Sequence, residues 1–112
     1  MLTFCKVKSL SKELPGVEEA TSYGTPALKV KGKLMARLKE DEATLVVRVT
    51  WDERERLLAT FPDVFFLAEH YRAHPWVLMR LSAAPLTVAR SVLHHSWLQS
   101  APPSLKRSVA AG

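Results

Sequence analysis

Five cations within eleven residues are the chain's clearest candidate for binding chemistry, and they are Lys29, Lys31, Lys33, Arg37 and Lys39. Ammonium and guanidinium groups neutralise phosphate charge, so such a cluster is typical of surfaces that contact nucleic acid. Tyr23 and Met35 lie nearby as apolar contacts for a sugar or a base. Because no base-reading helix with Arg, Asn and Gln at its exposed start accompanies the cations, we expect phosphate contacts of low sequence specificity.

The other reactive side chains do not assemble into a catalytic or metal-binding motif. His70 and His74 stand four residues apart, as zinc ligands on a helix do, but Tyr71 occupies the position of the motif's Glu. Cys5 could be a thiolate nucleophile, yet no activating base or cation can be named for it, and an unreactive Cys is the commoner case. We therefore expect no catalytic residue, no metal and no cofactor, and we expect that the chain is not an enzyme.

An alternating pattern predicts the β-hairpin that would carry the cations. Even positions from Leu28 to Leu38 are apolar except for Gly32, whereas the odd positions hold the charges. A three-residue loop at 31–33 would pair Val30 with Leu34 on the buried face and leave all five cations, together with Met35, facing solvent. The same alternation also fits a sheet face that is merely solvated and protected from aggregation.

Length and composition indicate a single domain. The chain has 112 residues, enough to bury a core without a metal or disulfide. Sixteen Lys and Arg against eleven Asp and Glu give a formal net charge of +5, which is compatible with a polyanionic partner but common in ordinary domains. The lone Cys5 and the lack of a long apolar run at the N-terminus favour the cytoplasm and no membrane partner.

Periodicity and turn residues predict the order of the elements. They are a helix near 2–14, a strand near 20–23, the hairpin, a strand at 44–50, a helix to about residue 60, strands at 64–67 and 76–81, and a helix from Pro85. Thr50 and Glu53 match a capping box at the start of the second helix. A single domain at 1–100 would be followed by a mobile tail at 101–112.

Four segments resemble the MmcQ/YjbR-like family in their order and spacing. They are Leu-Pro-Gly-Val-Glu-Glu at 14–19, Lys-Gly-Lys-Leu-Met-Ala at 31–36, His-Pro-Trp-Val at 74–77, and Ser-Trp at 96–97. The resemblance covers about residues 1–100. It implies an α+β fold of order α-β(3)-α-β(2)-α, an antiparallel sheet packed against helices in a secretion-chaperone-like layout, and a double-wing mode of DNA binding. It supplies no catalytic residues.

Two classes of function remain open. The first is a DNA-binding protein whose basic hairpin contacts phosphates, with RNA not distinguished from DNA. The second is a protein-interaction module that uses the open sheet face or edge, with Trp51, Trp76 or Trp97 as candidate anchors, although we expect Trp97 to belong to the core instead. A small-molecule enzyme ranks third, because no nucleophile, base and orienting group can be named.

Overall fold

Six strands form one antiparallel sheet in the order β1-β2-β3-β4-β6-β5 in the computed structural model, which describes residues 2–106. In chain order the elements are α1 (Phe4–Ser11), β1 (Val17–Ser22), β2 (Thr25–Val30), β3 (Lys33–Leu38), β4 (Thr44–Arg48), α2 (Trp51–Thr60), β5 (Phe65–Phe66), the 3-10 turn η1 (Glu69–Tyr71), β6 (Trp76–Arg80), the 3-10 turn η2 (Leu81–Ala83) and α3 (Leu86–Ser100). Within this described range, no helix is both long and apolar enough to cross a membrane.

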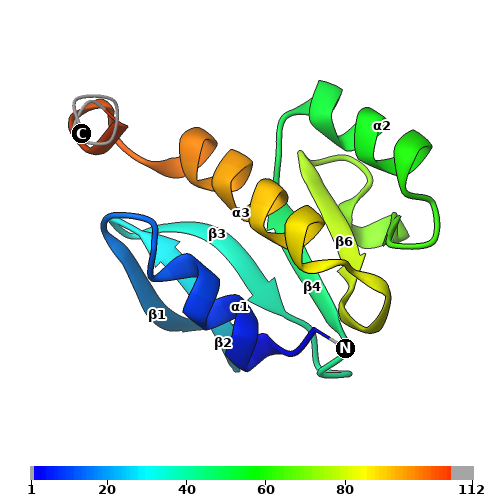
Figure 1. The fold of residues 1–112 in the computed structure, drawn as a ribbon, viewed down its shortest axis with the longest axis horizontal. Coiled ribbons are helices and arrows are strands. Elements are labelled where there is room, and N and C mark those ends of the chain that lie inside the picture. Colours follow the sequence, from blue (N-terminus) through cyan, green and yellow to red (C-terminus); the bar gives the residue numbers. More distant parts are fainter. Residues whose placement is uncertain (1, 107–112) are drawn as a thin grey trace.

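Helices α1 and α3 lie across one face of the sheet, and α2 lies at its β5–β6 end (Figure 1). The core forms between these helices and the sheet residues that point toward them. Trp97 of α3 is fully buried there, and its Nε1–H donates to the carbonyl of Pro15 at 2.8 Å. Ser96 donates to the carbonyl of Met35 at 3.1 Å, so α3 is tied directly to β3. We call the opposite side of the sheet the outer face.

The predicted α+β class, with an antiparallel sheet packed against helices, is confirmed. Four strands stand between α1 and α2, as the periodicity predicted, rather than the three that the resemblance implied, because the segment before the hairpin forms a full strand paired with β2. Thr50 caps α2 as predicted, since its hydroxyl accepts from the backbone N–H of Glu53 at 3.1 Å. The reciprocal contact of the capping box is replaced, because the backbone N–H of Thr50 donates to Nε2 of His95 at 3.3 Å.

The hairpin between β2 and β3 closes with a two-residue turn rather than the predicted three-residue loop. Lys31 and Gly32 both have positive φ, 48° and 82°, as a tight hairpin turn of this kind requires. Val30 therefore pairs with Lys33, and the predicted pairing of Val30 with Leu34 is wrong.

A β-bulge at Met35 changes which side chains of β3 face the core. Leu28 pairs with Ala36 and Lys29 with Leu34, so Met35 is an extra residue without a partner on β2. Met35 and Ala36 are both fully buried in the core, whereas Leu34 is half-buried outside it. An inserted residue shifts the alternation of a strand by one position. The predicted places of Leu34 in the core and Met35 in solvent are therefore wrong.

The segment after α3 packs on the domain as far as the structure describes it. Ala101 is buried in the core, and Leu105 is packed against it. A Cβ atom added to Gly16, whose φ is +77°, would lie 2.7 Å from Cδ1 of Leu105, so these two residues are in close contact. The remainder of the predicted tail, 107–112, lies outside the described residues.

Candidate nucleic-acid interface

The register divides the predicted cations between the two sides of the sheet. Directly paired residues of an antiparallel sheet present their side chains on the same face. Lys29 therefore shares the outer face with Leu34, whereas Lys33 shares the helix-covered side with the buried Val30. Lys31 is exposed in the turn. The prediction that all five cations face solvent together is wrong.

Arg37 lies on the outer face but is buried, with only 6% of its side chain exposed. Its Nε donates to the carbonyl of Ser22 at 3.2 Å, and its Nη1 donates to the hydroxyl of Tyr71 at 2.8 Å. Its Nη2 forms an ion pair with Glu40 at 2.5 Å, and the ring centroid of Tyr23 lies 5.2 Å from the guanidinium carbon. These partners occupy the guanidinium N–H groups that would otherwise donate to a phosphate.

Glu40 is ionised beside this guanidinium. A hydrogen bond from its own backbone N–H lowers the pKa of Glu40 below its ordinary value, and the contact with Arg37 lowers it further. The pair joins β3 to the turn that follows it. Arg37 thus connects three segments of the chain, and its positive charge is already matched.

Strands β4 and β6 add two cations to the outer face that the sequence analysis did not select. Arg48 pairs in register with Trp76, and its guanidinium carbon lies 4.4 Å from that ring's centroid. Its Nε donates to the carbonyl of Leu34 at 2.8 Å. Burial lowers the pKa of Arg48 below its ordinary value, although an arginine remains charged at neutral pH. Arg80 is exposed, with its guanidinium carbon 4.2 Å from the ring centroid of Phe66.

The alternation of these two strands contained the signal for both arginines. Leu45, Val47 and Val49 point toward the core from β4 and the residue after it. Arg48 must then point outward, and Arg80 follows by the same rule from the inward Met79 of β6.

A groove of about 740 Å³ crosses the outer face, and we call it the outer groove. Aromatic rings from three segments line it, namely Tyr23 from the β1–β2 turn, Tyr71 from η1 and Trp76 from β6. Lys39 contributes an ammonium group, and Leu34 is one of its apolar residues. The groove therefore combines flat rings with positive charge.

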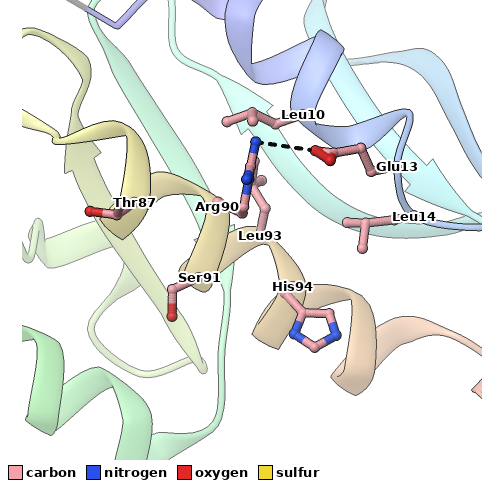
Figure 2. A pocket seen from close by; sticks show the side chains of 8 residues that line it. All are labelled: Leu10, Glu13, Leu14, Thr87, Arg90, Ser91, Leu93 and His94. Atoms are coloured by element: carbon pink, nitrogen blue, oxygen red, sulfur yellow. Dashed lines mark ion pairs between the residues drawn. The ribbon is translucent and has the colours of Figure 1, made fainter. Parts of the chain in front are cut away.

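A smaller hollow of about 390 Å³ lies between α1 and α3 (Figure 2). Leu10, Leu14 and Leu93 contribute apolar surface to it. Arg90 points from α3 toward Glu13, and their Nη2 and Oε2 atoms are 3.6 Å apart (Figure 2). Because this ion pair joins the two sides of the hollow, we assign the hollow to helix packing.

The two predicted histidines and the cysteine lie on different segments of the fold. His70 and His74 both line the outer groove, and the ring of His70 meets that of Tyr71 edge to face at 4.9 Å. Within residues 2–106, no group of three His, Cys, Asp or Glu side chains is placed to hold a metal ion. Cys5 is a free, exposed thiol. That the protein has no catalytic residue, metal or cofactor stays a prediction.

The fold and the outer face define an α+β domain whose antiparallel sheet is covered by helices on one side. The chain matches the YjbR family model over residues 12–99 and belongs to the YjbR family. The predicted resemblance to MmcQ/YjbR-like proteins is thereby confirmed.

A solved structure shares the fold. The crystal structure of Deinococcus radiodurans protein DR2400, which has a DUF419 domain, is similar with a TM-score of 0.74 and 24% sequence identity. The match covers 88% of this chain and 78% of that one. No curated protein sequence matches this chain. Function must be argued from the site, because one fold supports many activities.

Proposed function

We propose that the protein binds nucleic acid through the outer face of its sheet, contacting phosphates with low sequence specificity. The observation that carries this proposal is the gathering of four cations on the side opposite α1 and α3, and they are Lys29, Lys39, Arg48 and Arg80. Lys31 extends the charge into the exposed turn. Arg37 is not proposed as a phosphate contact, because its guanidinium is already engaged.

The negative charges of the same face do not cancel this attraction. Glu40 is bound by Arg37, and Glu18 faces Lys29 across the β1–β2 pair. The four proposed cations outnumber Glu18 and the Asp41 carboxylate, which accepts from the hydroxyl of Thr44 on the same face. Surface cations of this kind contribute mainly through release of counterions from the phosphate backbone, so binding should depend steeply on salt.

The composition of the chain explains why little base reading is expected. Asn and Gln are the side chains that make bidentate contacts with adenine. The chain contains no Asn and a single Gln, Gln99, which belongs to α3. Phosphate contacts position a protein on nucleic acid without reading its sequence.

A titration of labelled duplex DNA at several salt concentrations tests the proposal. Four phosphate contacts at about −0.9 each predict a slope of log K against log salt near −3.6. Changing Lys29 and Lys39 together to Glu should weaken binding more than about tenfold at roughly 50 mM salt and make the slope shallower. The matched control changes Lys6 and Lys12, exposed residues at α1, to Glu and should stay within about twofold of the wild type.

The two double variants alter the net charge equally, so they separate a site from bulk charge. Equal weakening by both would show that no particular face binds nucleic acid. Absence of any binding at about 50 mM salt, where the electrostatic term is large, would reject the proposal. A thermal melt of each variant checks that it folds.

The alternative function is a protein-interaction module. β1 is a six-residue strand at the edge of the described sheet, and its outward backbone groups could pair with an added strand. For either function we propose the cytoplasm as the setting, where the free and exposed thiol of Cys5 would remain reduced.

A further inference from the structure

We infer that the outer groove receives unpaired bases, so that the nucleic acid bound is single-stranded. This inference rests on the proposed function and names the ligand of the same site. It follows from the juxtaposition of Tyr23, Tyr71 and Trp76, three aromatic rings from the β1–β2 turn, η1 and β6, with the cations of the outer face.

Tyr23 is the first indication. It occupies the β1–β2 turn with φ of +53°, a left-handed conformation that is uncommon for a bulky residue, and Gly24 follows with φ of +79°. Turns of this type favour Asn or Asp at the first position. The side chain is also 86% exposed although it lines the groove. The ring lies beside the Arg37 guanidinium, whose carbon is 5.2 Å from the ring centroid, and most of the ring's surface remains available for stacking.

Tyr71 and Trp76 are held in place by neighbouring cations. The hydroxyl of Tyr71 accepts from Arg37, and the ring of Trp76 lies against the guanidinium of Arg48. Both side chains are half-buried. Rings fixed in this way lose little conformational freedom when a planar ligand stacks on them.

The combination of cations and aromatic rings on the outer face fits a single-stranded nucleic acid. Cations that follow the phosphates combined with aromatic side chains that stack on successive bases are the usual means of binding single strands without sequence preference. Sheet faces that carry exposed aromatics bind single-stranded RNA by the same principle. In a duplex the base faces are stacked inside the helix, so the rings of the groove could not reach them.

The electrostatic term alone would favour the opposite preference. Because of counterion release, each phosphate contact contributes about −0.9 to the slope of log K against log salt for duplex DNA and about −0.7 for a single strand. A protein that only neutralised phosphates would therefore bind a duplex at least as tightly. A preference for single strands would have to come from the bases.

The experiment compares a labelled 12-nucleotide oligo(dT) with a labelled 12-base-pair duplex on the full chain at about 100 mM salt, where surface charges are partly screened. We expect the single strand to bind about tenfold or more tightly, which corresponds to about 1.4 kcal/mol. Tyr23→Asn removes the ring but suits the left-handed turn, and it should weaken oligo(dT) binding about tenfold while duplex binding stays within about twofold. Trp76→Leu should also weaken oligo(dT) binding about tenfold, but because its ring lies against the guanidinium of Arg48, selectivity is judged from Tyr23→Asn.

Trp51→Leu is the matched control, since Trp51 is a 49% exposed aromatic on α2 that does not line the groove. It should leave both affinities within about twofold. If Trp76→Leu fails to fold in a thermal melt, Tyr23→Asn still tests the inference. This variant should fold, because the Tyr23 side chain packs little of its surface on the domain.

The outcomes separate this inference from the proposal on which it rests. Equal binding of oligo(dT) and duplex, or a Tyr23→Asn variant that binds oligo(dT) like the wild type, overturns the single-strand inference and leaves phosphate binding intact. Binding of neither nucleic acid overturns both. Binding of a poly-glutamate peptide as tightly as oligo(dT) would also overturn the inference, because it would show that charge suffices without bases.

Discussion

Replacing Arg37 with Met should destabilise the domain without removing a phosphate contact. The substitution keeps most of the aliphatic stem and removes the guanidinium. The carbonyl of Ser22 and the hydroxyl of Tyr71 would each lose a charged donor, at 3.2 and 2.8 Å respectively. Hydrogen bonds to charged groups contribute about 1.5–3 kcal/mol each. The ion pair with Glu40 adds little to this loss, since 65% of that side chain is exposed to solvent.

A compensating term reduces this loss. The folded wild type must desolvate a guanidinium whose side chain is only 6% exposed, and Met carries no such cost. We therefore expect a net loss of about 2–3 kcal/mol in the free energy of unfolding. For a chain of this length that is roughly 8–12 °C in the melting temperature.

The measurement is a pair of urea and thermal melts followed by circular dichroism, with Lys39→Met as the control. Lys39 lies two residues further along, outside β3 and half-buried, so its variant should unfold within about 0.5 kcal/mol of the wild type. In the nucleic-acid titration, Lys39→Met should have the larger effect of the two variants. Lys39→Met should make the salt slope shallower by about 0.7–0.9, whereas Arg37→Met should leave it unchanged.

A double-mutant cycle isolates the contact with η1. Tyr71→Phe removes the hydroxyl that accepts from Arg37, so the two substitutions should be coupled by about 1 kcal/mol. An Arg37→Met variant as stable as Lys39→Met, with a shallower salt slope, would refute the structural role and return Arg37 to the phosphate contacts.

Two further predictions concern stability. Met35→Asp should unfold the domain, because Met35 is fully buried and an unpaired charge there costs several kcal/mol, whereas Leu34→Asp on the outer face should still fold; comparable melts of the two variants would contradict the bulge. The Asp41 carboxylate accepts from the backbone N–H of Ala43, which lowers its pKa below the ordinary 3.8, and it also accepts from Thr44. Its stabilising effect is therefore complete above about pH 4 and is lost as the pH falls through the lower folded-state pKa. The wild type and Asp41→Ala should differ in free energy of unfolding by about 1 kcal/mol at pH 7. In urea melts this gap should shrink toward pH 2. A gap that stays constant with pH would exclude the carboxylate as its source.

The sequence predicted best where one local rule governs a whole element. Leu45, Val47 and Val49 point inward at every second position, as expected of the strand predicted at 44–50, because β4 has no inserted residue. Thr50 begins α2 because a side-chain oxygen can satisfy a helix N–H wherever it falls at the N-cap. Such features depend on residues within a few positions of one another.

The candidate site depends on contacts that no local pattern contains. The hydroxyl that fixes Arg37 belongs to Tyr71, 34 residues away, and the ring beside Arg48 belongs to Trp76. A count of alternating charges cannot distinguish an arginine that meets solvent from one that is buried under a distant loop. The contact of Thr50 with His95 could not be predicted from the sequence for the same reason, because the two residues are 45 positions apart.

The bulge determines which charges can share a ligand. Met35 is the one uncharged residue among the odd positions from 29 to 39, and its apolar side chain is accommodated by turning inward beside Ala36. The bulge leaves Leu34 and Arg37 on one face although they are three residues apart. In a regular strand, residues at this spacing point to opposite faces. Lys33 is thereby removed from the outer face. The surface that could bind nucleic acid is consequently assembled from four strands, β2, β3, β4 and β6, and the charge of the hairpin alone accounts for only part of it.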